Sequence, residues 1–501
     1  MRTDPHILVR RLAGAHDPVA LFAALHGGGA AHHFFRRTGG TALIIVDAAL
    51  EMEAGPREGV VRARSENGEA LLGRLLQDRS LPPARSEDGS AVFAFSAPTS
   101  EDDAERLRAP SPLDLLRSLA ALGAGEDDDP YAGALFTLVG FDHVDMAEDL
   151  PARAEGHFPD LLAYLAETMV VVEPGGSARL IALAAGSEDA ARAHRLAHLA
   201  AERLARLANR IEQTRPCEVA PAEPAVATSD ASDEAFAATV RALKENIAAG
   251  DIFQVVPSRS FFAPCTDPLA AFRRLCALDP SAYTFFAETP HGTLFGASPE
   301  TAVEVRPGRD RTIVAVSPIA GTRPRGATHD ADDRLEADLR LDTKESAEHL
   351  MLVDLARNDV ARVSTPGTRR VTSLMRVERF ARVMHLVSTV EGVLAQGLDA
   401  VHAIRACLNV GTLSGAPKLK AIELIRTHET RARGAYGGAI GVLTGRGAFD
   451  SAVVIRSALV RDGRAEVRAG AGVVADSDPA AEAAETRAKA SAVLDALGAA
   501  A

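Results

Sequence analysis

The pattern of apolar and polar positions divides this chain into two parts. Near the start, the apolar run Thr41–Leu50 predicts a strand, and Ser187–Asn209 has the apolar spacing of a helix. Residues Thr214–Glu234 carry prolines, alanines and small polar residues without an apolar period, which is typical of a linker or a long surface loop. We therefore predict an N-terminal part over residues 1–213, a linker at 214–234 and a second part over residues 235–501.

The second part shows both helical and strand patterns. Ser232 can cap a helix that ends at Gly250, and the apolar stretch Gly250–Phe261 then predicts a strand. Further along, the pattern predicts a long helix from Asp332 to Arg362, a meander of three antiparallel strands over residues 437–477 and a last helix from Asp478 to Gly498. The βαβ alternation of a Rossmann fold is missing, so the pattern predicts an antiparallel α+β fold.

Composition adds limits on compartment and partners. The 501 residues are 47% hydrophobic and 25% charged, and the formal net charge of −13 argues against a nucleic-acid surface. The four cysteines have no CxxC spacing, so neither a disulfide framework nor a zinc site is predicted. The first residues lack a signal-peptide pattern, and no apolar run is long enough to span a membrane. We expect a cytoplasmic protein.

Two predicted helices each carry a pair of glutamates on a face that also has residues to be buried. Glu345 and Glu348 share a stripe with leucines, and Glu482 and Glu485 share one with Lys489. One such pair alone is better explained by glutamates at the boundary of an amphipathic helix. Two pairs favour an all-oxygen site for a hard cation, and Mg²⁺ fits because it binds through one or two carboxylates.

Other polar residues lie in unusually apolar surroundings. Arg456 is predicted in the middle of an apolar strand, where it needs an anionic partner, either a structural carboxylate or a ligand. Gly470 and Gly472 allow a close approach to the backbone of the next strand. Gln254 lies in the predicted strand Gly250–Phe261. Taken alone, it is most simply explained as an edge-strand amide that faces water. Backbone amides, Arg456, Lys489 and a cation together describe a site for a small anionic ligand such as a dicarboxylate.

Several long motifs resemble one enzyme family. They include "PIAGTRPRG", "EHLMLVDLARNDVARV", "GTLSGAPK", "FDSAVVIRSALV" and "AGAGVVADSDPAAEAAETRAKA". In this order they are similar to the chorismate-utilising enzymes and, among these, to the large subunits (component I) of anthranilate synthases. The resemblance runs from about Ala235 to Leu497 and is weaker before the linker. It makes residues 235–501 the chorismate-binding catalytic domain and residues 1–213 a regulatory or structural part.

The resemblance implies a four-layer αββα sandwich with large antiparallel sheets and one Mg²⁺. Glu348 and Glu485 would hold the ion, with Glu345 and Glu482 in or next to that shell. The ion, the segment Gly470–Ala471–Gly472 and Lys489 would bind the ring carboxylate of chorismate. The remaining residues would contact the enolpyruvyl carboxylate or line the ring: Tyr436, Arg456, Gly321, Thr322 and Thr412.

The resemblance also implies a reaction with ammonia. Relatives that add water carry a lysine base at the position of Gln254, and an amide cannot take that proton. Relatives that lead to 4-aminobenzoate carry a nucleophilic lysine at the position of Ala320. Glu300 would protonate the leaving C4 hydroxyl, and His385 would assist the loss of the C2 proton and pyruvate. The expected products are anthranilate and pyruvate, in the first committed step of tryptophan biosynthesis.

The same resemblance implies a partner subunit and leaves two alternative functions open. No glutaminase signature is found, so we expect a separate glutamine amidotransferase subunit that supplies ammonia, in a heterotetramer. One alternative function is that of a 2-amino-2-deoxyisochorismate synthase, which does not eliminate pyruvate. The other is that of a catalytically silent chorismate-binding subunit. The family's tryptophan site usually contains "LLES"-like and "PYM"-like segments, where this chain has "FFRRTGG" (Phe34–Gly40) and "AYT" (Ala282–Thr284).

Overall fold

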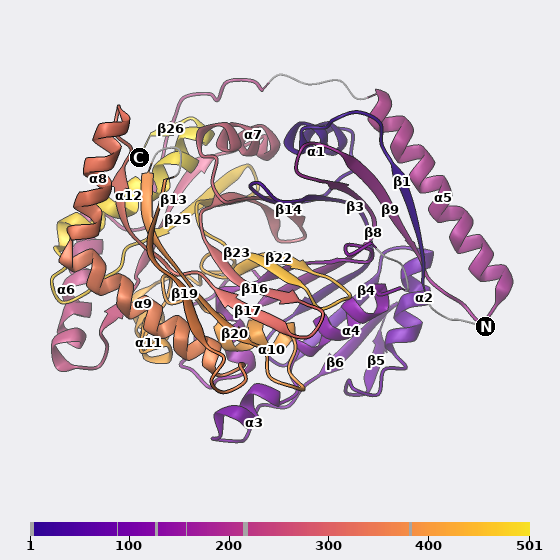
Figure 1. Ribbon diagram of the computed structural model, residues 1–501, viewed down its shortest axis with the longest axis horizontal. Helices are drawn as coiled ribbons and strands as arrows, with labels where there is room; N and C mark the ends of the chain where they lie inside the picture. Colours follow the sequence, from indigo (N-terminus) through magenta and orange to yellow (C-terminus); the bar gives the residue numbers. More distant parts are fainter. Residues whose placement is uncertain are drawn as a thin grey trace.

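The computed structural model of the chain describes residues 5–87, 89–125, 129–156, 158–213, 219–379 and 383–500. Strands fill the middle of the molecule and helices lie outside them (Figure 1). In the N-terminal part, the strands are β1 (His6–Arg11), β2 (His33–Arg37), β3 (Ala42–Ala54), β4 (Glu58–Ala63), β5 (Ala84–Glu87), β6 (Ser90–Ala94), β7 (Leu135–Val139), β8 (Leu161–Val172) and β9 (Ala178–Ala184). The helices there are α1 (Pro18–Gly27), α2 (Glu66–Leu75), α3 (Asp103–Arg108), α4 (Asp114–Gly123), the 3₁₀ helix η1 (Phe141–Met146) and α5 (Ala190–Gln213).

The second part contributes the remaining elements. Its strands are β10 (Ala225–Val226), β11 (Thr228–Ser229), β12 (Gln254–Val255), β13 (Ser258–Pro264), β14 (Tyr283–Thr289), β15 (Gly292–Ser298), β16 (Thr301–Pro307), β17 (Thr312–Val316), β18 (Ile319–Pro324), β19 (Arg370–Arg379), β20 (Val383–Val393), β21 (Gly415–Ala416), β22 (Ala439–Leu443), β23 (Phe449–Val453), β24 (Ser457–Arg461), β25 (Arg464–Gly470) and β26 (Ala499–Ala500). Its helices are α6 (Asp233–Ala249), α7 (Pro268–Leu278), α8 (His329–Leu341), α9 (Thr343–Ala361), α10 (Ala400–Cys407), α11 (Lys418–His428) and α12 (Pro479–Leu497).

Two large antiparallel sheets share the long strands β3 and β8. The first half of β3 pairs with β2 and its second half with β4, and register shifts between the halves let the strand bend. The first sheet continues from β2 through β14, β15, β24, β25 and β13. The second runs from β8 through β7, β22, β23, β16, β17 and β20. Helices α5, α7 and α12 pack on the first sheet and α2, α9 and α10 on the second, so the predicted layered α+β fold is confirmed.

Strands from before and after the predicted linker share both sheets, through the pairs β2–β14 and β7–β22. The division into residues 1–213 and 235–501 therefore does not correspond to separate sheets. That residues 235–501 form the catalytic part and residues 1–213 a regulatory or structural part stays a prediction. Residues 214–218 of the linker lie outside the described residues. The following residues form two short strands, β10 against β26 and β11 against β13.

The chain passes from one sheet to the other at two adjacent connections. Between β15 and β16 lie Pro299 and Glu300, and between β23 and β24 lie Val454 to Arg456. The two connections are joined by hydrogen bonds: the amide of Val453 donates to the carbonyl of Glu300, and the amide of Ala297 to the carbonyl of Arg456, each at 3.0 Å. Arg456 is thus not in the middle of a strand as predicted. Its backbone has a φ of +48°, which ends β23 and re-aims the chain into β24.

The predicted meander over residues 437–477 contains four strands instead of three. Because the kink at Arg456 separates them, β22–β23 and β24–β25 are two hairpins in different sheets. The predicted strand Gly250–Phe261 is also interrupted, because Pro257 cannot donate a ladder hydrogen bond. Only β12 and β13 on either side of it are paired.

The predicted helix Asp332–Arg362 is two helices that meet at Asp342. The carboxylate of Asp342 accepts a hydrogen bond from the amide of Glu345 at 3.1 Å and so caps α9. Arg323 of β18 holds the same carboxylate at 2.7 Å. As a result Leu341 leaves the predicted stripe and is 80% exposed, whereas Glu345 and Glu348 stay together on α9.

The helices α6 and α12 are confirmed as predicted, with caps at Ser232 and Asp478 and left-handed glycines at Gly250 and Gly498. Within the described ranges, strand pairs are antiparallel except for β10 with β26. None of the helices there combines the length and apolar character needed to cross a bilayer.

Candidate active site

A cavity of about 400 Å³ lies where the two sheet connections meet α9 and α12. The cavity gathers side chains that are up to 235 positions apart in the sequence, from Gln254 to Lys489. All predicted site residues except Ala471 line it, namely Gln254, Glu300, Gly321, Thr322, Glu345, Glu348, His385, Thr412, Tyr436, Arg456, Gly470, Gly472, Glu482, Glu485 and Lys489.

Glu300 is a buried acid at the connection between β15 and β16. Burial raises the pKa of its carboxyl from the ordinary 4.5 to about 8, although a hydrogen bond from Thr412 and the charge of Lys489 oppose the rise. The Thr412 hydroxyl donates to Glu300 Oε1 at 2.7 Å. At neutral pH the side chain is therefore mostly protonated and can act as an acid.

His385 of β20 has the opposite shift for the same reason. Burial lowers its pKa to about 4, while a hydrogen bond to the Gly321 carbonyl opposes the change. Nδ1 lies 3.0 Å from that carbonyl and 3.1 Å from the Thr322 hydroxyl. Because a carbonyl only accepts, Nδ1 carries the proton and Nε2 is the basic nitrogen. At neutral pH His385 is a neutral base.

The four predicted metal-binding glutamates face the cavity from α9 and α12. Burial raises the pKa of Glu348 to about 7 and also raises those of Glu345 and Glu482. Burial acts on Glu485 in the same way, but an ion pair with Lys489 Nζ at 2.7 Å outweighs it and lowers the pKa. The four carboxylates thus line one cavity, and they raise one another's pKa by repulsion at Glu348 and Glu482.

Two of these glutamates have buried oxygens without a hydrogen bond, Oε1 of Glu348 and Oε2 of Glu482. Buried acceptors normally have a donor, so these oxygens indicate a missing positive ligand. As they stand, no three or more His, Cys, Asp or Glu side chains in the described ranges are arranged to hold a metal ion. The donor set and the two oxygens nevertheless fit a hard cation, and magnesium stays a prediction.

The cavity also carries positive groups. Arg456 Nη1 donates to the carbonyl of Lys489 at 2.7 Å, which fixes the guanidinium against α12. Lys489 Nζ donates to the Gly470 carbonyl at 3.0 Å. A Cβ on Gly470 would lie 2.7 Å from the carbonyl oxygen of Pro257 and 3.1 Å from the hydroxyl oxygen of Tyr436, so the backbone contact requires glycine there. Arg456, Lys489 and Tyr436 together can bind a carboxylate.

Gln254 and Ala471 do not lie where the sequence suggested. Gln254 is not an edge-strand residue facing water: it is 4% exposed, and its Oε1 is buried without a hydrogen bond. A Cβ on Gly472 would lie 3.0 Å from its Nε2, so this glycine leaves room for the amide. Ala471 does not line the cavity, because its side chain is in the core and its amide donates to the Pro257 carbonyl.

Two charged residues of the cavity were missed by sequence reasoning. Lys344 of α9 lies 3.7 Å from Glu348 Oε1, and the four carboxylates raise its pKa against the effect of burial. Its position four residues before Glu348 was a usable signal. Arg468 of β25 also lines the cavity. The sequence could not predict this, because the face of the sheet to which Arg468 points depends on the register of the strand. The turn before α11 contributes Thr412 and Leu413, whereas residues 414–418 do not line the cavity.

Comparisons with known proteins agree on one family. The family model of chorismate binding enzymes matches residues 80–495. The chain is 42% identical over 516 residues to anthranilate synthase component 1 of Vibrio cholerae, which covers 99% of this chain and 97% of that protein. It is 44% identical over 470 residues to the pyocyanine-specific component 1 of Pseudomonas aeruginosa, covering 92% and 87%. The solved structure of anthranilate synthase component I from Streptococcus pneumoniae has a TM-score of 0.71 at 30% identity, covering 91% and 92%.

The raised pKa of Glu300 predicts how the stability of the protein changes with pH. Between the ordinary pKa of 4.5 and about 8, the folded state keeps a proton that the unfolded state has lost, so stability falls as pH rises through this window. Glu300→Gln removes this loss. We expect the variant to gain on the order of 2 kcal/mol of unfolding free energy over the wild type near pH 8, and little near pH 5, in denaturant titrations.

The matched control is Glu423→Gln on α11, whose carboxylate is 37% exposed and pairs with Lys420 at the surface. Its stability difference from the wild type should be the same at both pH values. A Glu300→Gln difference that does not change with pH would contradict the raised pKa.

Proposed function

Because the chain belongs to the family of chorismate binding enzymes, we propose that it is component 1 of an anthranilate synthase, converting chorismate and ammonia to anthranilate and pyruvate in tryptophan biosynthesis. The observation that carries this proposal is the pair of shifts in one cavity: burial holds Glu300 protonated and His385 neutral at neutral pH. Opposite shifts of two titratable groups assign an acid and a base. The reaction needs both, an acid for the leaving hydroxyl and a base for the ring proton.

Substrate binding follows from the charged groups that line the cavity. Arg456, Tyr436 and Lys489 bind carboxylate oxygens of chorismate, and Arg456 is held for this by the Lys489 carbonyl. Glu345, Glu348, Glu482 and Glu485 would hold Mg²⁺, which neutralises a substrate carboxylate beside these acidic groups when it is bound. Gly321 has a φ of +72°, and its carbonyl keeps the proton of His385 on Nδ1. Thus Nε2 is the atom that takes the C2 proton.

The nucleophile is ammonia because the cavity offers no base to activate water at β12. The Gln254 amide cannot take a proton, and ammonia attacks with its own lone pair. Glu300 gives its proton to the departing C4 hydroxyl and is left as a carboxylate that the Thr412 hydroxyl stabilises. Ala320 carries no nucleophile that could form a covalent intermediate on this wall.

The ammonia comes from a second subunit. The relatives are named as component 1, so a second component is expected to act with each of them. For this chain the partner is a glutamine amidotransferase that hydrolyses glutamine, and the assembly is a heterotetramer.

A product assay tests the proposal directly. Purified protein with chorismate, Mg²⁺ and ammonium salt should form anthranilate and pyruvate in equal amounts, measured by fluorescence and by a coupled lactate dehydrogenase reaction. An aminated product that retains its pyruvyl group would favour a 2-amino-2-deoxyisochorismate synthase. Binding of chorismate without turnover would favour a silent subunit.

The metal assignment predicts two inactive variants. Glu348→Gln and Glu485→Gln each remove a charged oxygen ligand, so Mg²⁺-dependent anthranilate formation should fall by at least about a hundredfold, with an unchanged circular dichroism spectrum. The control Glu423→Gln should keep full activity. Near wild-type turnover of either variant at low Mg²⁺ would show that the metal assignment is wrong.

The role of His385 predicts a variant that separates the two half-reactions. Amination needs the acid Glu300, whereas elimination needs removal of the C2 proton by His385. In His385→Ala, the aminated, pyruvate-bearing intermediate should therefore accumulate, as detected by liquid chromatography. Anthranilate formation at an undiminished rate would exclude this role.

Weak inhibition by L-tryptophan is predicted from the regulatory segments. Strand pairing places Arg36 opposite Thr284 and Arg37 opposite Tyr283, so the two segments that depart from the family pattern are direct neighbours. Arg37 Nη1 lies 2.9 Å from Glu304 Oε1, and its guanidinium lies over the Tyr283 ring at 5.6 Å. Arg36, on the same face as Thr284, repels the ammonium of tryptophan, and Thr284 offers less apolar surface than methionine does. Arg37 is on the other face and is already paired with Glu304.

Loss of a few kcal/mol of binding lowers affinity on the order of a hundredfold. We therefore expect no more than slight inhibition at micromolar tryptophan when the ligand is titrated into the chorismate reaction. Half-inhibition at micromolar concentration would show that other residues form an effective pocket.

A further inference from the structure

The part of α9 that carries Glu345 and Glu348 has few contacts with the apolar core. The core residues of α9 all lie closer to its C-terminus, namely Val353, Ala356 and Val360. Over residues 343–351, His349 is the only side chain that is buried, and it has no exposed surface. The position of the two glutamates therefore depends on what holds His349.

A hydrogen bond joins His349 to β20. Its Nε2 lies 2.6 Å from the hydroxyl oxygen of Ser388, which is also fully buried. The amide of Ser388 donates to the Pro318 carbonyl at 3.1 Å, so the backbone of this serine is fixed as well. Ser388 lies three residues after His385 on the same strand. One hydrogen bond thus connects the glutamate-bearing part of α9 with the strand that carries the base.

The same hydroxyl stabilises a bulge in β19. Two residues of β19, Leu374 and Met375, stand opposite the single residue Ser388. Met375 has a φ of +51°, a left-handed conformation that is uncommon for a residue other than glycine. Its amide donates to the Ser388 hydroxyl oxygen at 2.9 Å. The hydroxyl therefore links three segments, α9, β19 and β20.

These contacts determine the direction of each hydrogen bond. A serine hydroxyl has one hydrogen to donate, and here its oxygen already accepts from the Met375 amide. If Nε2 of His349 carried the ring hydrogen, the hydroxyl hydrogen would have no acceptor among the described residues. The hydroxyl of Ser388 therefore donates to Nε2, and Nδ1 carries the hydrogen. Nδ1 is buried without a hydrogen bond, which destabilises the fold, so stability alone does not explain a histidine at this position.

The other end of this part of α9 is also fixed by a directional contact. The Asp342 carboxylate caps the helix at the amide of Glu345 and is held by Arg323. Hydrogen bonds weaken steeply when their angle changes, whereas apolar contacts tolerate small rotations. The cap and the bond from His349 together can therefore fix the rotation of α9 at its two glutamates.

We propose that His349 is a positioning residue, whose hydrogen bond to Ser388 sets where Glu345 and Glu348 lie relative to His385. His349 does not line the active cavity and acts only through these neighbours. The consequence for catalysis rests on the proposed function, in which the two glutamates would hold Mg²⁺. Removal of a group that orients metal ligands typically lowers metal affinity by about 10- to 100-fold.

Hydrogen exchange of the protein without substrate or metal tests the proposal with two matched variants. Glutamine and methionine have the same side-chain length and similar helix propensities, but only glutamine offers an amide oxygen to the Ser388 hydroxyl. In His349→Met, the amides of residues 343–351 should exchange about tenfold faster, and those of residues 353–361 at the wild-type rate. His349→Gln should restore the protection. This measurement needs no turnover, so it does not depend on the proposed reaction.

A Mg²⁺ titration of anthranilate formation gives the second measurement. His349→Met should need roughly tenfold more Mg²⁺ for its half-maximal rate while unfolding near the wild-type temperature. His349→Gln should need close to the wild-type concentration. The control Leu350→Gln changes the next residue of α9, which is 46% exposed, and should leave exchange and Mg²⁺ requirement unchanged.

Three results would overturn the proposal. These are unchanged exchange over residues 343–351 in His349→Met, an equal increase in His349→Met and His349→Gln, and a lower unfolding temperature of His349→Met with an unchanged Mg²⁺ requirement. The last result would show that His349 only stabilises the fold. If the exchange rates change as expected but the wild type forms no anthranilate, the proposed function is wrong and the positioning role of His349 stands.

Discussion

The two adjacent connections between the sheets determine where the reactive groups lie. Each sheet alone would direct its side chains into a core, but the chain leaves the first sheet at Glu300 and returns to it at Arg456. Mutual hydrogen bonds fix the connections to each other. The left-handed backbone of Arg456 costs on the order of 1 kcal/mol. It is held by these hydrogen bonds and by the contact of its side chain with the Lys489 carbonyl.

Burial in the active cavity has opposite effects on its acid and its base. Low exposure destabilises whichever form of a group is charged, so it protonates Glu300 and deprotonates His385. The glutamates of α9 and α12 are pushed in the same direction as Glu300, but they face Lys344 and Lys489, which keep part of their charge in place. A cation would complete this balance, since Glu348 and Glu482 each retain a buried oxygen without a donor.

Much of this site could be predicted because helical spacing is visible in a sequence. Glu482, Glu485 and Lys489 lie on an unbroken α12, and all three line the cavity. The break at Asp342 was missed, although aspartate and threonine are poor helix formers and Asp342 with Glu345 three residues later has the spacing of a helix N-cap. The kink at Arg456 was missed as well, since β-branched residues on both sides continue a strand pattern. That kink depends on pairing with a strand that lies 151 positions earlier in the chain, because Ala452 pairs with Thr301. Local propensity contains no information about such a distant pairing.

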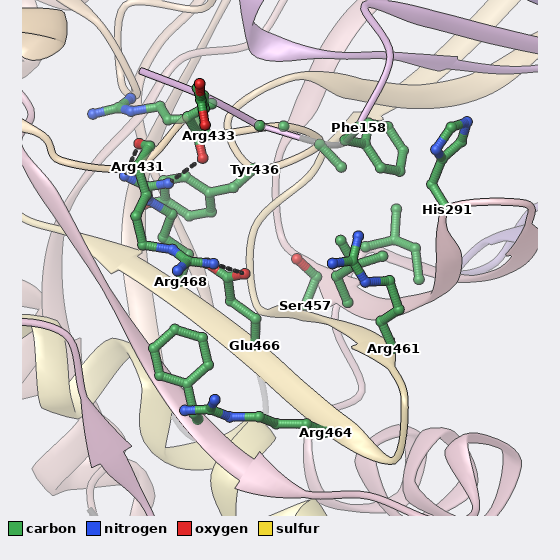
Figure 2. Close-up of a pocket in the computed structure, with 18 of the residues that line it drawn as sticks. Phe158, His291, Arg431, Arg433, Tyr436, Ser457, Arg461, Arg464, Glu466 and Arg468 are labelled. Carbon is green, nitrogen blue, oxygen red and sulfur yellow. Dashed lines mark hydrogen bonds and ion pairs between the residues drawn. The ribbon is translucent and has the colours of Figure 1, made fainter. Parts of the chain in front are cut away.

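A second cavity, of about 570 Å³, shares Tyr436 and Arg468 with the active cavity (Figure 2) and could not be found from the sequence at all, because it depends on register. Its lining residues Arg461 and Arg464 become opposed only when the Asp462–Gly463 turn closes β24 onto β25. The same register turns Arg468 toward Glu429, which also accepts from Ser258 and Arg433. A buried carboxylate with this many donors makes a rigid wall, because any movement would leave a charge unpaired in a low-dielectric interior. Two cavities can therefore share Tyr436 and Arg468 and stay separate, each with its own arginines.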